Sequence, residues 1–382
     1  MTNQSRRVRR KGAVPSRKMA SKCERVDRIS KLPDDILVSV ISRLTVAEAT
    51  STSILSTRWR HLHTLIHRLV FCPSQQQISR IRKKHPKKLL AQIKEFTEYM
   101  KVIDGVLDSY VGILEEFRVD LPCLLGANMN KWLQFALERK VESIGIHIMS
   151  NNKLTTRDPH ALMRYGGYYH FPRSALRNNA VVPGLESLKQ LSLRGVHVQE
   201  RDVSLFLLSL TGLESLSISF SEKLRKVRAL GHSKLKILYI SSCKNVESIE
   251  VSDMNNLASL ICPDLGRFDQ LRYQVLMPQL KLNNLPNLIH FEISDRRDQS
   301  LIDILPTIPS CIRNQLLHLK LTTDPSFIRL TSLENYKFHR FENLKHLELD
   351  IFMQCNKYSV RRLIPMISAC PLLETIEIKV SD

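Results

Sequence analysis

A short pattern of apolar residues recurs along the chain from residue 114 to the C-terminus. In each copy, an apolar residue is followed three positions later by a second and two positions after that by a third. Such alternation is typical of a short β-strand whose alternate side chains point into a core. The copies are Leu114/Phe117/Val119, Val141/Ile144/Ile146, Leu188/Leu191/Leu193, Leu213/Leu216/Ile218, Leu235/Leu238/Ile240, Leu257/Leu260/Cys262, Leu288/Phe291/Ile293, Leu316/Leu319/Leu321, Leu344/Leu347/Leu349 and Leu373/Ile376/Ile378.

The distances between copies are those of leucine-rich repeats. Successive first positions lie 27, 47, 25, 22, 22, 31, 28, 28 and 29 residues apart, and most steps fall at or near the roughly 20–29 residues of that repeat. The long step contains the irregular stretch 151–173, where we expect a degenerate repeat or an inserted loop. Val246/Ile249/Val251 predicts an additional half-step strand within the shortest repeats.

Helical spacing of apolar residues appears between the strands of the longer repeats. Residues 130–140, 201–210 and 359–369 have apolar residues three and four positions apart, as in amphipathic helices. Strands alternating with helices at this period predict a curved α/β leucine-rich-repeat solenoid over 89–382, with parallel strands on its concave face. A helix over 89–108 is expected to cap the N-terminal end of this domain.

The stretch 27–68 has a different pattern and predicts a small unit of three short helices. Pro33 is tolerated at a helix start, and Asp34 and Asp35 place negative charge at the positive end of the helix dipole. Thr45 and Glu48 form a capping-box pattern for a second helix, while a third is expected to carry Trp59. About forty residues cannot bury so much apolar surface alone. We therefore expect another surface to cover part of it.

Two segments of this unit resemble the F-box of plant F-box/leucine-rich-repeat proteins of the F-box/FBD/LRR type. They are the Leu-Pro-Asp-Asp-Ile-Leu opening at 32–37 and the Ser-Ile-Leu-Ser-Thr-Arg-Trp-Arg-His-Leu ending at 53–62. Leu44 is followed by Thr45 where many members have proline, and a capping threonine serves the same turn. Further motifs at 132–136, 191–196 and 370–374 also resemble this family. Many relatives continue beyond the last motif, so we expect the C-terminal end to be uncapped or truncated.

The resemblance implies a substrate-recognition subunit of an SCF-type cullin-RING ubiquitin ligase. Its F-box would bind a Skp-type adaptor and, through it, a cullin scaffold, while the repeats would bind an unknown target protein. The pattern does not separate adaptor contacts from residues that pack the helices together. The candidate adaptor-binding residues are Leu32, Pro33, Ile36, Leu37, Ile41, Leu44, Leu55 and Trp59, and the candidate substrate-binding residues are Arg194, Tyr239, His346 and Glu348.

The positive charge of the chain is concentrated near its N-terminus. The formal net charge is +20 over 382 residues, and residues 1–100 hold 22 Lys and Arg against 7 Asp and Glu. We expect a disordered basic arm over 1–26 and an exposed basic linker over 69–88. The arm is either a nuclear-import signal or a solvated tail. A nucleic-acid-binding body would carry its charge on the folded repeats, which disfavours that function.

Composition and motifs argue against catalysis, a metal and a cofactor. The eight cysteines include no Cys-x-x-Cys pair, the histidines are not grouped with cysteines or carboxylates, and there is no glycine-rich phosphate loop. Cys243 and Cys370 are expected to fill buried repeat positions. Without a secretory signal or a membrane-length apolar run, a reducing compartment, nucleus or cytoplasm, is expected.

Two alternative functions remain open at this point. The chain can be a scaffold whose F-box binds the adaptor without delivering a substrate, or a nucleic-acid-associated protein that uses its basic arm. Gating of target recognition by a small molecule is also left undecided, because the sequence does not reveal a pocket.

Overall fold

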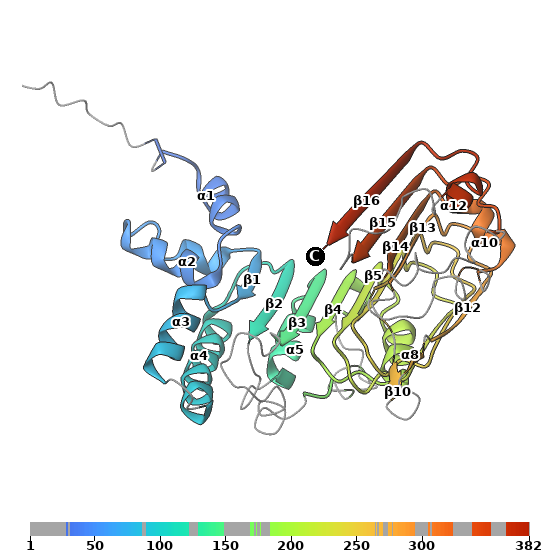
Figure 1. Cartoon of the computed structure of the whole chain (residues 1–382). Coiled ribbons are helices and arrows are strands. Elements are labelled where there is room, and N and C mark those ends of the chain that lie inside the picture. The colour runs from blue at the N-terminus through green and yellow to red at the C-terminus, as the bar shows by residue number, and fades with distance from the viewer. Residues whose placement is uncertain are drawn as a thin grey trace, which may run out of the picture.

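The computed structural model describes the chain from the F-box-like unit to the last repeat, with gaps. The described residues are 28–29, 31–85, 89–121, 129–148, 169–171, 173, 176, 184–263, 265, 267–269, 274–276, 278–294, 305, 308–323, 338–352 and 364–381. The basic arm expected over 1–26 lies outside them. Figure 1 shows the helices of the N-terminal unit at one end of a long sheet, whose strands lie side by side along an arc.

The repeats form a parallel sheet in which eleven strands are described. All ten copies of the apolar pattern contribute one strand each, so the predicted strands are confirmed. Their register keeps equivalent positions side by side, as in Leu191, Leu216 and Leu238. In spatial order the strands are β1 (Arg68–Phe71), β2 (Glu116–Leu121), β3 (Ser143–Ile148), β4 (Gln190–Arg194), β5 (Ser215–Ser219), β7 (Ile237–Ser241), β9 (Ser259–Cys262), β13 (His290–Ser294), β14 (His318–Thr323), β15 (His346–Phe352) and β16 (Thr375–Ser381).

In the shortest repeats a second strand replaces the helix. Leu213, Leu224, Leu235, Val246 and Leu257 recur at a constant spacing, half that of the repeat, and each precedes a strand. So short a repeat has room for two short strands and their turns, whereas a helix would need more chain. The half-step strand is confirmed as β8. It forms a second parallel sheet of β6 (Lys226–Leu230), β8 (Ser248–Ser252) and β12 (Gln279–Asn283).

Helices occur in the longer repeats, as predicted, although their ends differ by a few residues. Figure 1 shows α5 and α10 on the outer side of the arc. For the expected helix over 359–369, the part before residue 364 lies outside the described residues. The other elements of the repeats are α5 (Met129–Glu138), η4 (Leu185–Ser187), α8 (Glu200–Ser209), α10 (Ser310–Gln315), α12 (Ile364–Ser368), β10 (Arg267–Asp269) and β11 (Gln274–Leu276).

The expectation of an exposed linker over 69–88 is wrong for residues 69–85, while 86–88 lie outside the described residues. Residues 68–71 form β1, which pairs in parallel with β2, and α3 (Gln75–Lys84) follows with a capping box between Ser74 and Gln77. Its buried Ile78 shows why the segment is structured although most of its residues are polar. Ile66, Leu69 and Phe71 have the spacing of the repeat strands, and this signal could have revealed β1.

Helix α4 (Leu89–Ser109) matches the predicted helix in position but not in its expected role. It belongs to the connection from β1 to β2, so the first described strand lies before it and not after it. The buried residues of the N-terminal unit and of the repeats form one continuous hydrophobic cluster, from Leu37 to Cys370. The N-terminal unit is therefore packed against the first strand of the sheet.

Candidate functional site

The N-terminal unit consists of two short helices followed by tighter turns. These elements are α1 (Asp34–Ile41), α2 (Val46–Ser51), η1 (Thr52–Ile54) and η2 (Leu62–Leu65). The predicted third helix is wrong, because residues 56–61 form turns before η2. Trp59 and Leu62 are nevertheless buried. The chain must bring both side chains into the core and reach β1 within a few residues. These packing requirements outweigh the helical spacing of the apolar residues, so no helix forms here.

One arginine joins the two ends of the F-box-like motif. Arg58 Nε donates a hydrogen bond of 2.7 Å to Asp34 Oδ1, and Arg58 Nη2 donates to the carbonyl oxygen of Leu32. The Leu-Pro-Asp opening and the Arg-Trp-Arg ending therefore contact each other although they are far apart in sequence. This explains why the spacing between the two segments matters for the fold of the unit.

The predicted capping box at the start of α2 is confirmed. Glu48 N–H donates to Thr45 Oγ1 at 3.3 Å, and Thr45 N–H donates to Glu48 Oε2 at 2.9 Å. Hydrogen bonds from the Thr45 backbone and hydroxyl lower the pKa of Glu48. We expect Thr45→Ala to cost about 1 kcal/mol of stability. Urea unfolding of both proteins measures this loss, and an unchanged midpoint would contradict it.

The structure separates the eight candidate adaptor-binding residues into three groups by burial. Leu37, Ile41 and Trp59 are buried in the core of the chain, so they pack the unit rather than face a partner. Leu32 and Leu44 are half-buried against the same core. Pro33, Ile36 and Leu55 are exposed. Of the eight, only the residues of this last group are exposed.

Sequence reasoning missed three exposed apolar residues of the same unit. Ile54 is 85% exposed, Ile29 is 58% exposed and Val40 is 52% exposed. Val40 follows Ile36 by one helical turn, and this spacing was the available signal. Clusters of exposed apolar side chains on a protein surface are typical of protein-binding sites. We refer to Ile29, Pro33, Ile36, Val40, Ile54 and Leu55 as the F-box surface.

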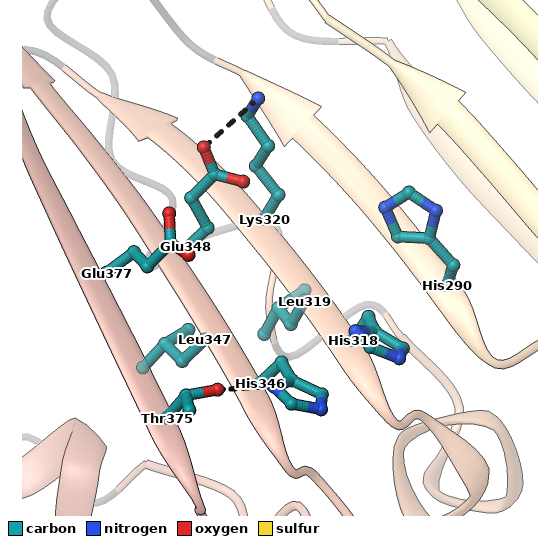
Figure 2. Close-up of a pocket in the computed structure, with 9 residues that line it drawn as sticks. All are labelled: His290, His318, Leu319, Lys320, His346, Leu347, Glu348, Thr375 and Glu377. Carbon is teal, nitrogen blue, oxygen red and sulfur yellow. Dashed lines mark hydrogen bonds and ion pairs between the residues drawn. The ribbon is translucent and has the colours of Figure 1, made fainter.

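The repeats present a second candidate surface, the polar face of the main sheet, formed by side chains that alternate with the buried ones. The four candidate substrate-binding residues all lie on it, but they do not converge. Arg194 on β4 lies over the Phe220 ring, 4.4 Å from its centroid, and Tyr239 is half-buried on β7. His346 and Glu348 on β15 line one groove together with residues of β13, β14 and β16 (Figure 2).

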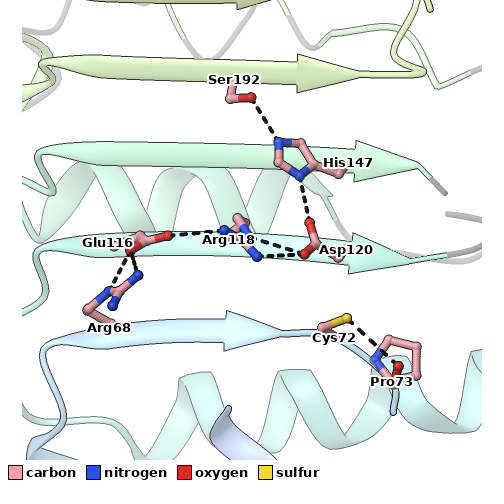
Figure 3. A network of polar contacts seen from close by, with 8 residues as sticks. All are labelled: Arg68, Cys72, Pro73, Glu116, Arg118, Asp120, His147 and Ser192. Carbon is pink, nitrogen blue, oxygen red and sulfur yellow. Dashed lines mark hydrogen bonds and ion pairs between the residues drawn. The ribbon is translucent and has the colours of Figure 1, made fainter. Parts of the chain in front are cut away.

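A chain of polar contacts crosses the polar face at its F-box end (Figure 3). Arg68 binds Glu116 with an N–O distance of 2.6 Å, and Arg118 Nη2 lies 3.0 Å from Asp120 Oδ2. His147 continues the chain, with Nδ1 2.7 Å from Asp120 Oδ1 and Nε2 2.9 Å from the Ser192 hydroxyl. These contacts join four neighbouring strands, β1 to β4.

The Ser192, His147 and Asp120 contacts have the connectivity of a nucleophile, base and acid. Catalysis of acyl transfer also needs donors directed at a developing oxyanion. Strand β4 is paired on both sides, so the backbone N–H groups around Ser192 are used by the sheet. These contacts are better explained as links between adjacent strands.

Burial alone would raise the pKa of Asp120. Hydrogen bonds and charges from His147 and Arg118 have the larger combined effect, so the pKa is lowered. A carboxyl group with a lowered folded pKa contributes stability above its unfolded pKa and loses it as the pH falls. We expect Asp120→Asn to cost about 1–3 kcal/mol at pH 7. Urea unfolding should show this difference unchanged to about pH 5 and smaller below about pH 4. A difference that grows in acid would contradict the assignment.

The thiols of Cys243 and Cys370 are buried, as the sequence predicted. Burial raises the pKa of Cys243 to about 12 and that of Cys370 to about 11, so both are protonated at neutral pH. Among the described residues, no group of three histidine, cysteine or carboxylate side chains is arranged to hold a metal ion. The helices within the described ranges are also too short or too polar to cross a membrane.

Comparison with known families matches both parts of the chain. Residues 29–62 match the F-box domain, and residues 115–382 match the leucine-rich-repeat domain of At1g61320/AtMIF1. The first match contains all six residues of the F-box surface. The second contains the main sheet from β2 onward.

Similar proteins in Arabidopsis thaliana include the F-box protein At1g80960, which is 27% identical over 69% of this chain. F-box/LRR-repeat protein At3g03360 is 22% identical over 92% of the chain, and putative F-box/LRR-repeat protein At3g42770 is 26% identical over 90%. The alignments cover 54%, 70% and 63% of these relatives, so the chain spans about half the length of the first. From both domain matches and these relatives, we conclude that the chain belongs to the plant F-box/leucine-rich-repeat protein family.

Proposed function

We propose that the protein is the substrate-recognition subunit of an SCF-type cullin-RING ubiquitin ligase. The observation that carries this proposal is the F-box surface, where apolar side chains are exposed although the rest of the unit is packed on the repeats. Ile54 and Leu55 are 85% and 63% exposed. A Skp-type adaptor that covers these side chains would remove their apolar area from water, which favours binding.

The repeats would hold the target on the polar face of the main sheet, which is the concave side of the proposed solenoid. Because the adaptor would bind at the opposite end of the same rigid core, the target would be kept near the ubiquitin-charged enzyme. Such tethering raises the effective concentration of the target without new contacts at the reacting groups. The protein itself would make and break no covalent bond. We place its action in the nucleus or cytoplasm, where this machinery works.

The continuous core supports this tethering role. Buried residues extend without interruption from Leu37 in α1 through the repeats, so the unit is not a flexible appendage. Tyr110 reinforces the junction, because its hydroxyl lies 2.6 Å from the carbonyl oxygen of Ile66 and 2.9 Å from that of Ile113 and can donate its one hydrogen to either. A fixed junction would hold a bound target at a defined distance from the adaptor.

The direct test is copurification of the full chain with a Skp-type adaptor and a cullin scaffold. Affinity purification with mass spectrometry under proteasome inhibition would then identify adaptor and target together. We expect the adaptor in stoichiometric amount and at least one protein whose ubiquitination falls after depletion of this chain. Absence of the adaptor would contradict the proposal. Adaptor binding without any ubiquitination change would instead favour a scaffold that delivers no substrate.

A further inference from the structure

The groove at the far end of the polar face contains a row of three histidines. His290, His318 and His346 occupy the same register position on the adjacent strands β13, β14 and β15. The rings of His318 and His346 are stacked with centroids 4.4 Å apart, and His290 meets His318 edge-on at 6.2 Å. The groove has a volume of about 370 Å³. Figure 2 shows the three rings along one side of it.

A row of charged residues lies beside the histidines, two positions further along each strand. It contains three glutamates and one lysine in register: Glu292, Lys320, Glu348 and Glu377. The Lys320 ammonium is shared between Glu292 at 3.8 Å and Glu348 at 3.4 Å. Lys379 of the next row also binds Glu348 at 2.5 Å and lies 3.7 Å from Glu377, so two lysines serve the three carboxylates of this row.

The surrounding charges among the described residues do not remove this excess. The next row holds one acid and one base, Asp350 and Lys379, in register with each other. On the other side of the histidines, Lys345 binds Glu374 at 2.7 Å. Across all of these rows the groove keeps two more carboxylates than lysines. This local excess is unusual for a chain whose net charge is +20.

The pKa of Glu292 reflects the same excess of carboxylates. Burial raises the pKa of Glu292, and the nearby carboxylates of Glu348 and Asp350 raise it further against the effect of Lys320. A carboxyl group in this condition is stabilised in its charged form by any additional cation. Lys379 and Lys320 instead lower the pKa of Glu348, so Glu292 is the carboxylate of the row that an additional positive group would stabilise most.

We propose that this groove binds a lysine- or arginine-bearing segment of a protein partner. The inference rests on the proposed function, in which this partner is the target held by the repeats. The ammonium or guanidinium group would contact Glu292, Glu348 and Glu377. Arginine stacks on aromatic faces, and the uncharged imidazole of a histidine can accept a hydrogen bond, so the histidine row suits the same ligand.

The histidine row would also make this binding depend on pH. Burial lowers the pKa of His290 and of His318, with further contributions from Lys320 at the first and the neighbouring histidines at the second. Both are therefore mostly uncharged at pH 7.5. At lower pH, protonation adds positive charge beside the carboxylate row and opposes a basic ligand. Among the described residues, the groups that face the row are Ser259, Glu292, Lys320, Lys345, Glu348, Asp350, Glu374, Thr375, Glu377 and Lys379.

The test measures binding of a fluorescein-labelled decapeptide of alternating lysine and serine to the full chain purified with its adaptor. Fluorescence anisotropy is recorded at pH 7.5, with a glutamate–serine decapeptide for comparison. We expect the basic peptide to bind at least tenfold more tightly than the acidic one. Combined Glu292→Gln, Glu348→Gln and Glu377→Gln substitutions should weaken its binding at least tenfold.

A matched control removes three carboxylates elsewhere. Glu98→Gln, Glu138→Gln and Glu186→Gln change the net charge equally at exposed positions outside the groove. This variant should bind the basic peptide within threefold of wild type. Equal losses in both variants, or equal binding of both peptides, would overturn the proposal.

A second variant tests the histidine row separately. Wild-type affinity for the basic peptide should fall at least threefold as the pH is lowered from 7.5 to 5, mainly below pH 6.5, because the pKa values of His290 and His318 are lowered from 6.5. His290→Gln, His318→Gln and His346→Gln together should reduce that change, leaving the part due to protonation of Glu292, and an undiminished pH dependence would overturn the role of the row. Coelution with the adaptor is recorded for every preparation. Retained coelution without peptide binding rejects the groove alone, whereas lost adaptor binding in wild type rejects the proposed function itself.

Discussion

Replacing Ile54 and Leu55 by glutamate should abolish binding of a Skp-type adaptor while the chain stays folded. Their side chains are 85% and 63% exposed, so their removal leaves no cavity in the core. In a complex, each would bury apolar area worth about 1.5–3 kcal/mol, and a glutamate in its place would have to lose its hydration. We expect the dissociation constant to rise at least about 100-fold, or roughly 2.8 kcal/mol. Isothermal titration calorimetry with the purified adaptor measures this change.

The matched control places the same charges on equally exposed apolar positions of the repeats. Leu208 on α8 is 78% exposed and Ile364 on α12 is 54% exposed. Leu208→Glu with Ile364→Glu should leave adaptor affinity within about twofold. Unchanged affinity in the Ile54 and Leu55 double variant would remove both residues from the adaptor interface. Thermal unfolding of both variants shows whether any loss of binding comes from misfolding.

Substitution of the buried motif residues would test adaptor binding less clearly than substitution of Ile54 and Leu55. Leu37 and Ile41 are essentially fully buried, so shortening either would destabilise the unit and reduce binding indirectly. The F-box motif combines residues that form the unit with residues that face outward. Only the exposed ones separate the two effects.

The repeat strands could be predicted because their signal is local. Each strand buries alternate residues, and the resulting apolar spacing is visible within six positions of sequence. Cys262 stands at the third apolar position of its copy, and it is buried on β9 as predicted. The strand β1 has the same spacing in Ile66, Leu69 and Phe71, but it lies beside the F-box-like motif and far before the next copy. Only the structure identifies β1 as a strand of the main sheet, because it shows the pairing of β1 with β2.

The candidate surfaces were harder to predict because they depend on neighbours that are distant in sequence. His290, His318 and His346 lie on three successive repeats, and their stacking follows from strand register. Likewise, helical spacing marks Val40 and Ile41 as parts of one apolar stripe. Packing of α1 on η2 then decides that Ile41 is buried while Val40 remains exposed.

Trp132→Ala should cause the largest loss of stability, and it tests whether the F-box and repeats unfold together. Trp132 on α5 is fully buried, and its Nε1 donates a hydrogen bond of 2.6 Å to Asp104 Oδ1 on α4. Truncation of such a side chain leaves a cavity and costs about 3–5 kcal/mol. Leu208→Ala, at an exposed position, should stay within about 0.5 kcal/mol of wild type.

The chain has two tryptophans, and this makes the test specific. In Trp132→Ala, Trp59 of the F-box is the remaining fluorescent indole, while far-UV circular dichroism reports mainly on the repeats. Because one hydrophobic cluster contains Trp59 and the repeat core, we expect both signals to shift to lower urea concentration together. Coincident transitions indicate one cooperative unit. If Trp59 fluorescence kept its wild-type midpoint while the dichroism shifted, the F-box would fold independently, and the rigid link proposed between adaptor and target would be wrong.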